Sequence, residues 1–279
     1  MPVTVMTPSQ IQQFYNTYKK YLLPNTNEYI KYFFKIDGVT VSIYESGKVV
    51  FMGKDLSMFN KYFPISKYDN ANTIGSDEVG TGDIFGPIVV ASTYVKKEMV
   101  SELKELGVKD SKTIPDHKIV QIAQYVIKKY PDIYTYYILD NERLNDFKDK
   151  FNLNEFKAYI HNHNIRILKD KFEYDYICLD DFCGEKKYYN YLSKYDKSNP
   201  VTGISFETKG EGKSIAVALS SIIARYLFLE SIKKLEEKYG YKLKLGGSKE
   251  VNKVIDKIKS DGNSKILYHI AKLSFKTFN

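Results

Sequence analysis

The chain has 279 residues, of which 43% are hydrophobic and 27% are charged, a composition typical of globular proteins with a packed core. Its two cysteines, Cys178 and Cys183, are too few for a disulfide-stabilised secreted scaffold, and no second cysteine pair completes a zinc site. The N-terminus lacks a signal-peptide pattern and no apolar run approaches the ~18 residues of a membrane span, so we expect a soluble, cytoplasmic protein. The formal net charge of +8 favours a polyanionic partner.

Residues 1–67 are predicted to form a small N-terminal substrate-binding domain. Apolar positions with a period of 3.6 predict a helix that begins at Pro8 and ends before Pro24. Three strands separated by glycine turns follow, at residues 29–36, 40–45 and 48–52. Basic residues outnumber acidic ones by eight to four in this stretch, which makes it a candidate clamp for a polyanion. The alternative is a packing domain with a charged hairpin.

Residues 73–279 are predicted to form a larger second domain, separated from the first by a polar, unpatterned linker at 64–72. Its predicted strands lie at 73–76, 88–95, 133–139 and 174–179, and its predicted helices at 98–106, 115–130 and 154–172. This alternation indicates an α/β sandwich with a central mixed sheet. Residues 215–229 predict a buried helix, and 248–259 and 264–273 predict amphipathic helices.

Two adjacent acids, Asp77 and Glu78, end the first strand of this domain. Three glycines and a proline follow within nine residues, and they allow the backbone to turn sharply and to approach a ligand closely. A buried charge needs a partner or a metal, so the pair is either a solvated acidic turn or a cation site. Because adjacent strand residues point to opposite faces, both acids reach one site only if the chain turns at once, for which we expect Val79-Gly80.

The string from Asp77 to Pro87, Asp-Glu-Val-Gly-Thr-Gly-Asp-Ile-Phe-Gly-Pro, resembles the first catalytic motif of the type 2 ribonucleases H. Its Gly-Thr-Gly-Asp variant resembles ribonuclease HIII more than ribonuclease HII. Residues 106–112, 177–182 and 208–225 resemble the second, third and fourth blocks of the family, in the family's order. The C-terminal residues 271–277 resemble its ending, with Ser274 where a histidine is expected. The resemblance covers nearly the whole chain.

The resemblance implies a ribonuclease H-like α/β catalytic domain with a central mixed sheet, preceded by a small α+β domain similar to the TATA-box-binding protein. It also implies an endonuclease that hydrolyses the RNA strand of RNA/DNA hybrids by two-metal-ion catalysis with Mg²⁺ or Mn²⁺, leaving 5′-phosphate and 3′-hydroxyl ends. We expect a monomer whose partner is the hybrid. Two alternatives stay open: ribonuclease HII-like incision at single ribonucleotides in DNA, and a non-catalytic hybrid-binding protein.

By the same resemblance, four acids are both catalytic and metal-binding: Asp77, Glu78, Asp180 and Glu211. Asp77 is expected to bridge two metal ions, with Asp180 and Glu211 on either side, while Glu78 helps to fix an ion and its waters. Asp181 competes with Asp180 for the third position and stands where the family commonly has glutamine. Glu211 has the alternative role of an acid that stabilises a helix N-terminus.

The resemblance also implies how the substrate is recognised. Backbone groups of Gly80, Thr81 and Gly82 are expected to contact the 2′-hydroxyls that distinguish RNA from DNA. A second segment carries the expected phosphate contacts, which are Lys109, Ser111 and Lys112. Without its partner blocks, this second segment would be interpreted as an exposed turn.

Overall fold

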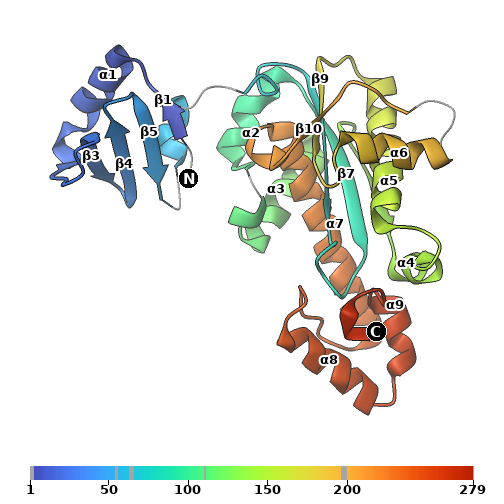
Figure 1. The fold of residues 1–279 in the computed structure, drawn as a ribbon. Helices are drawn as coiled ribbons and strands as arrows, with labels where there is room; N and C mark the ends of the chain where they lie inside the picture. The colour runs from blue at the N-terminus through green and yellow to red at the C-terminus, as the bar shows by residue number, and fades with distance from the viewer. Residues whose placement is uncertain (1–2, 54–55, 63–65, 110, 196–199, 279) are drawn as a thin grey trace. The chain divides into compact units, whose positions relative to one another are not determined.

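The computed structural model describes residues 3–53, 56–62, 66–109, 111–195 and 200–278 (Figure 1). The chain divides into two compact units, Met1–Ile65 and Ser66–Asn279. Each unit has its own hydrophobic core. Pro64, where the predicted linker begins, and Asp110, within the expected phosphate-binding segment, lie outside the described residues.

In its described residues, the N-terminal unit is an antiparallel sheet with the strand order β1-β5-β4-β3-β2 and one α-helix. Its elements are β1 (Val3–Val5), α1 (Pro8–Tyr18), β2 (Leu22–Leu23), β3 (Ile30–Ile36), β4 (Val39–Tyr44) and β5 (Lys48–Met52). The three strands predicted from the sequence are confirmed within a residue at their ends. The short strands β1 and β2 carry too few residues for a pattern to predict them.

Helix α1 covers one face of this sheet. It begins after Thr7, whose hydroxyl accepts a hydrogen bond from the Gln10 amide while the Gln10 side chain accepts one from the Thr7 amide. Phe14 of the helix is fully buried, and its ring meets those of Phe34 and Phe51 edge to face. These aromatic contacts hold the helix on the sheet, which confirms a small α+β domain ahead of the catalytic one.

The C-terminal unit contains a mixed sheet with the strand order β10-β9-β6-β7-β8. Its strands are β6 (Thr73–Val79), β7 (Ile88–Val95), β8 (Tyr134–Leu139), β9 (Tyr176–Asp180) and β10 (Ile204–Glu207). The strands β10, β9 and β6 run parallel, whereas β7 pairs antiparallel with β6 and with β8. The predicted α/β class with a central mixed sheet is therefore confirmed.

The helices of this unit are α2 (Val100–Leu106), α3 (Asp116–Lys129), α4 (Asn141–Phe147), α5 (Leu153–Lys171), α6 (Glu185–Tyr195), α7 (Ile215–Tyr239), α8 (Lys249–Ser260) and α9 (Leu267–Ile270). The sequence did not predict α4, α6 or β10. The helix predicted for 264–273 is wrong beyond Ile270, because the chain there pairs with the loop after β6.

Helix α7 packs along the sheet against β6 and β7 (Figure 1). By length and composition it could cross a membrane, contrary to our expectation from the sequence, but 67% of its most apolar window is buried inside the protein. A Cβ atom added at Gly75 of β6 would lie 2.2 Å from the Ala216 carbonyl carbon of α7. The strand and the core helix are therefore in direct backbone contact.

Residues 66–72 pack onto the C-terminal unit, so the predicted linker is wrong for this part. The Tyr68 hydroxyl donates to Glu207 Oε1 at 2.5 Å. Asp69 Oδ1 accepts the amide hydrogen of Ile215 at 2.8 Å, and Asp69 Oδ2 lies 2.9 Å from Lys104 Nζ. Asp69 thus caps the N-terminus of α7, where unpaired amides favour a carboxylate.

The chain after α9 holds the glycine-rich loop that follows β6. The Lys272 amide donates to the Ile84 carbonyl at 2.8 Å. Its side chain is 2% exposed, and Nζ donates to the carbonyls of Asp83 and Gly86. Burial lowers the pKa of the Lys272 ammonium to about 7, against a small opposing effect of the Asp83 charge. The C-terminal segment therefore fixes the shape of this loop.

Substituting Gly75→Ala should lower the free energy of unfolding by about 1–3 kcal/mol or more, because the added methyl group meets rigid backbone. Urea-induced unfolding measures the change. Gly247→Ala is the control, since a Cβ there has no neighbour within 4 Å, and we expect a change within about 0.5 kcal/mol. Equal losses in the two variants would contradict the backbone contact.

Substituting Lys272→Met should change the pH dependence of stability. In the unfolded chain the lysine pKa is about 10.4, so between pH 7 and 10 the unfolded state binds more protons at this position than the folded state. The free energy of unfolding of the wild type should therefore rise with pH relative to the variant, by at most about 1.4 kcal/mol per pH unit. Urea unfolding at pH 7 and pH 9 measures it, with the exposed Lys276→Met as the control. Parallel pH curves for wild type and Lys272→Met would contradict it.

Candidate active site

The two adjacent acids lie within β6, and the chain turns only at Gly80, where φ is 100°. The turn thus comes at the second residue of the expected Val79-Gly80 pair, but Val79 still continues the strand, so the turn is too late to bring both acids to one face. Because consecutive strand residues alternate, Asp77 and Glu78 leave opposite faces of the sheet. Asp77 accepts a hydrogen bond from Ser221 of α7, whereas Glu78 Oε1 lies 2.8 Å from Lys157 Nζ of α5.

Asp77 is buried at the end of the sheet, with 7% of its surface exposed. Burial raises the pKa of its carboxyl group well above the ordinary value, and the charges of Glu78 and Asp180 act in the same direction. The Ser221 hydroxyl opposes this rise. Burial and like charge both favour the neutral acid, so a cation at this position would stabilise the ionised form.

Asp180 is the last residue of β9, the strand next to β6. Its Oδ1 accepts the amide hydrogen of Gly210 at 2.7 Å. Burial raises its pKa to about 6, the Gly210 amide lowers it, and the charges of Glu211 and Glu78 raise it. The parallel pairing of β9 with β6 therefore brings this carboxylate close to the acids on its neighbour.

The competing acid Asp181 has a different environment. Its Oδ1 accepts the amide hydrogens of Cys183 at 3.1 Å and of Gly184 at 2.6 Å, which closes the turn ahead of α6. For Asp180, burial and the charges of Glu211 and Glu78 account for the rise in pKa.

Glu211 lies in a short 3₁₀ turn, Gly210–Gly212, directly before α7. It is 8% exposed, and its Oε2 is buried with no hydrogen-bond partner among the described residues. Its Oε1 lies 3.8 Å from Lys112 Nζ. The sequence also allows Glu211 to be an acid that stabilises the N-terminus of a helix. At α7 this role is taken by Asp69, which accepts the amide hydrogen of Ile215. Glu211 is therefore a buried carboxylate with capacity for another ligand.

Glu78 is held by two side chains of α5. Its Oε1 accepts from Lys157 Nζ at 2.8 Å, and its Oε2 lies 2.9 Å from His161 Nε2. Burial raises the pKa of Glu78, but its interactions with His161 and Lys157 outweigh burial and bring the pKa to about 2. Neither Lys157 nor His161 belongs to a motif that the sequence analysis identified. Lys157 and His161 are four residues apart and therefore share one face of α5. The sequence pattern does not predict that this face packs against β6.

The loop after β6 contains the three expected 2′-hydroxyl contacts. The backbone itself requires glycine at position 80, because φ is positive there and a Cβ atom would lie 2.3 Å from the Pro87 carbonyl oxygen. The fold does not require glycine at position 82, since a Cβ atom there would have no neighbour within 4 Å. Thr81 between them is half-buried and Gly82 is exposed. The open space at Gly82 allows another molecule to approach the backbone.

The second expected binding segment lies beside α7. Ser111 is half-buried, and its Oγ lies 2.8 Å from Ser221 Oγ, the hydroxyl that also bonds Asp77. Lys109 and Lys112 are exposed. The sequence did not identify Ser221, although its place inside an apolar helix marked it as a polar group in need of a partner.

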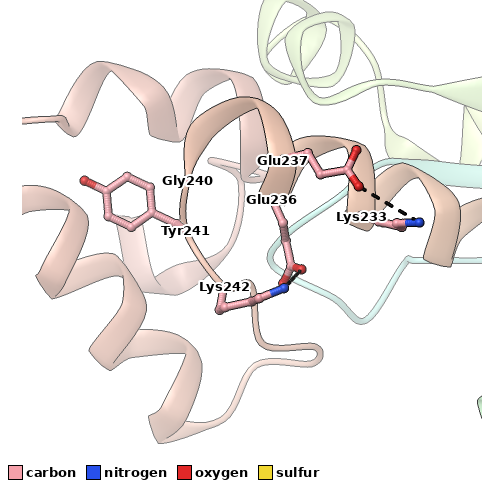
Figure 2. Close-up of a pocket in the computed structure, with 6 residues that line it drawn as sticks. All are labelled: Lys233, Glu236, Glu237, Gly240, Tyr241 and Lys242. Carbon is pink, nitrogen blue, oxygen red and sulfur yellow. Dashed lines mark hydrogen bonds and ion pairs between the residues drawn. The ribbon is translucent and has the colours of Figure 1, made fainter.

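No three His, Cys, Asp or Glu side chains stand as a ready-made metal-binding group in the part of the chain that the structure describes. Glu78 turns toward α5, which separates it from the other acids of the cluster. The pocket in Figure 2 lies elsewhere, at the C-terminal end of α7. The charged side chains that line this pocket form ion pairs with one another: Lys242 Nζ lies 2.8 Å from Glu236 Oε2, and Lys233 Nζ lies 4.0 Å from Glu237 Oε1.

Known proteins resemble both units of the chain. Residues 74–278 match the family model of ribonuclease HII, and residues 2–72 match a domain of unknown function, DUF3378. Ribonuclease HIII of Lactococcus lactis subsp. cremoris (strain SK11) is 35% identical over 280 residues, covering 98% of this chain and 95% of that protein. Ribonuclease HIII of Streptococcus pneumoniae (strain CGSP14) is 37% identical over 287 residues, covering 99% and 97%.

Among solved structures, Bst-RNase HIII in complex with Mn²⁺ is 29% identical, with a TM-score of 0.74 over 99% of this chain and 96% of that one. The ribonuclease HII match includes all four acids and the loop after β6. The curated relatives extend through the N-terminal unit as well. The chain therefore belongs to the ribonuclease HII family of endoribonucleases, and its full-length relatives are ribonucleases HIII.

Proposed function

We propose that the chain cleaves the RNA strand of RNA/DNA hybrids at the acids that β6, β9 and the turn before α7 bring together. The observation that carries the proposal is the buried Oε2 of Glu211, which has no hydrogen-bond partner among the described residues and belongs to a carboxylate whose charge acts on Asp180. A buried carboxylate oxygen in this state is expected to bind a cation.

The available oxygens fit a divalent metal ion. Magnesium and manganese prefer hard oxygen ligands and usually take one or two carboxylates together with phosphate oxygens and water. Asp77, Asp180 and Glu211 would hold the ions, and Glu78 would support them from the other face of β6. Two bound ions would activate the attacking water and stabilise the leaving 3′ oxygen, giving 5′-phosphate and 3′-hydroxyl products.

The protein residues prepare this site in distinct ways. Ser221 and the Gly210 amide orient Asp77 and Asp180. Burial of both carboxylates strengthens their attraction for a cation, because the charges are poorly screened there. The exposed Lys109 and Lys112 are suited to phosphate oxygens. Ser111, first expected at the phosphate, supports the site through Ser221.

Discrimination of RNA from DNA is assigned to the loop after β6. Backbone groups of Gly80, Thr81 and Gly82 are proposed to contact 2′-hydroxyls. The open space at Gly82 supports this, since it admits a sugar edge close to the backbone. Lys272 holds the far end of the loop through two carbonyl groups, which limits the shapes that it can adopt.

The N-terminal unit, proposed as the domain of residues 1–67, is a clamp for the hybrid. The face of its sheet away from α1 carries Lys35 of β3 and Lys48 of β5. Lys48 Nζ lies 6.0 Å from the Tyr44 ring centroid on the same face. Basic groups beside a half-buried ring such as Tyr44 suit phosphates and sugars. We also propose that the enzyme is a monomer and is located in the cytoplasm.

Cleavage of matched duplexes tests the proposed activity. With Mg²⁺ or Mn²⁺, the protein should cut an RNA/DNA hybrid efficiently, a DNA duplex with one ribonucleotide poorly, and all-DNA not at all. Asp77→Asn should lower hybrid cleavage by on the order of 10³-fold or more, since several kcal/mol of transition-state stabilisation are lost. Its hybrid binding should remain.

Each other result has a definite meaning. Efficient cutting at the single ribonucleotide would support the ribonuclease HII-like alternative. Binding of the hybrid without cutting any duplex would support the binding-protein alternative. Substantial turnover by Asp77→Asn would contradict the metal assignment.

The double substitution Lys35→Ala/Lys48→Ala should weaken hybrid binding, with little change in the rate at saturating substrate. Each lost phosphate contact should reduce the slope of log affinity against log salt by about 1. Fluorescence anisotropy at several salt concentrations measures both effects. Lys19→Ala/Lys20→Ala removes the same charge after α1 and should change the slope less. Equal changes in both double variants would contradict a clamp on this sheet face.

A further inference from the structure

Lys157 is a buried lysine inside the carboxylate cluster. Its side chain is 7% exposed, and Nζ lies 2.8 Å from Glu78 Oε1, whose own side chain is 9% exposed. The ring centroid of Phe182 lies 4.1 Å from the same nitrogen. The ammonium is therefore confined between a carboxylate and an aromatic face, both of which attract a cation.

His161 fixes the other oxygen of the same carboxylate. The imidazole is fully buried, and its Nε2 lies 2.9 Å from Glu78 Oε2. Its Nδ1 lies 2.7 Å from Ser76 Oγ, which is itself 2.7 Å from Ser92 Oγ. If Nε2 carries the proton and donates it in a hydrogen bond to Glu78, Nδ1 can accept a hydrogen bond from Ser76. Both ring nitrogens then have a hydrogen-bond partner. His161 is thus fixed on both ring nitrogens and holds the second oxygen of Glu78 toward α5.

The charge of the site needs compensation before any metal is bound. Asp77, Glu78, Asp180 and Glu211 all lie at one edge of the sheet, and Asp77 responds to the charges of both Glu78 and Asp180. Lys157 is the basic group bonded to this cluster from the side of α5. Lys157 is carried by α5, which packs against β6 and β7.

We infer that Lys157 is a positioning residue that acts as a fixed counter-cation: it holds Glu78 toward α5 when the site is metal-free and thereby weakens the affinity of the site for divalent ions. The inference rests on the proposed metal-dependent function. Without the ammonium, Glu78 keeps only the hydrogen bond to His161 on the side of α5, and the net charge of the cluster becomes more negative by one unit. A purely structural role of Lys157 predicts no gain in metal affinity.

Mn²⁺ binding to the full chain tests the inference without reference to activity. Lys157→Met removes the charge and keeps an unbranched side chain beside Phe182. Isothermal titration should show Mn²⁺ binding about tenfold tighter or more than in the wild type, because one positive charge within a few ångströms is gone. The melting temperature of the variant should fall in EDTA and should recover in Mn²⁺, so that its metal-induced rise exceeds that of the wild type.

Two further lysine variants and a control make the result specific. Lys157→Gln is neutral but can still donate to Glu78, so it should fold and also bind Mn²⁺ more tightly. Lys157→Arg keeps the charge and should bind within about threefold of the wild type. Lys194→Met breaks the 2.6 Å pair with Glu155 at the other side of α5. It should lower the melting temperature equally with and without Mn²⁺.

The outcomes separate the inference from the proposed function. If the wild type binds Mn²⁺ and cleaves the hybrid, while both neutral variants bind Mn²⁺ no more tightly than the wild type, the inference about Lys157 is wrong and the function stands. If the wild type neither binds Mn²⁺ nor cleaves, both are overturned. Tighter binding in both neutral variants, with wild-type affinity in Lys157→Arg, supports a fixed counter-cation.

Discussion

Repulsion among carboxylates buried at one edge of a sheet is the constraint on which much of the surrounding structure depends. Taking these groups out of water is unfavourable unless each finds a partner. Asp77 has the Ser221 hydroxyl, Asp180 has the Gly210 amide, and Glu78 has Lys157 with His161. Glu211 has a buried oxygen with no such partner among the described residues. Among these four acids, Glu211 is therefore the one beside which we propose that a cation binds.

The fold brings the acids together through a small number of close contacts. Gly75 lets α7 approach β6 to backbone distance, and Asp69 caps the start of that helix. The turn that carries Glu211 is therefore held beside the strand ends. The parallel pairing of β9 with β6 places Asp180 at the same edge, as expected for adjacent carboxyl ends of strands. Strand alternation then divides the acids between the two faces.

Elements with a strong local pattern were predictable. The strands β3 to β9 and the helices α3, α5 and α8 follow apolar periodicities in segments of five residues or more. Helix α4 and strand β10 have few apolar positions and depend on tertiary contacts, as with Asn145, whose side chain donates to the Ala271 carbonyl. Residues 66–72 are polar, so their sequence pattern is that of a linker. They are nevertheless ordered, because they form hydrogen bonds with residues far away in the sequence, such as Glu207 and Ile215.

The family resemblance, the mixed α/β class and the candidate acids follow from the amino-acid sequence, because motif strings and apolar periods are local properties. Three features follow only from the packing: Asp77 and Glu78 face different helices, Asp69 caps α7, and Lys157 pairs with Glu78. Such pairs join residues that are 79 to 146 positions apart. Their meeting depends on how helices pack across the sheet, and no local pattern in a single chain encodes that packing.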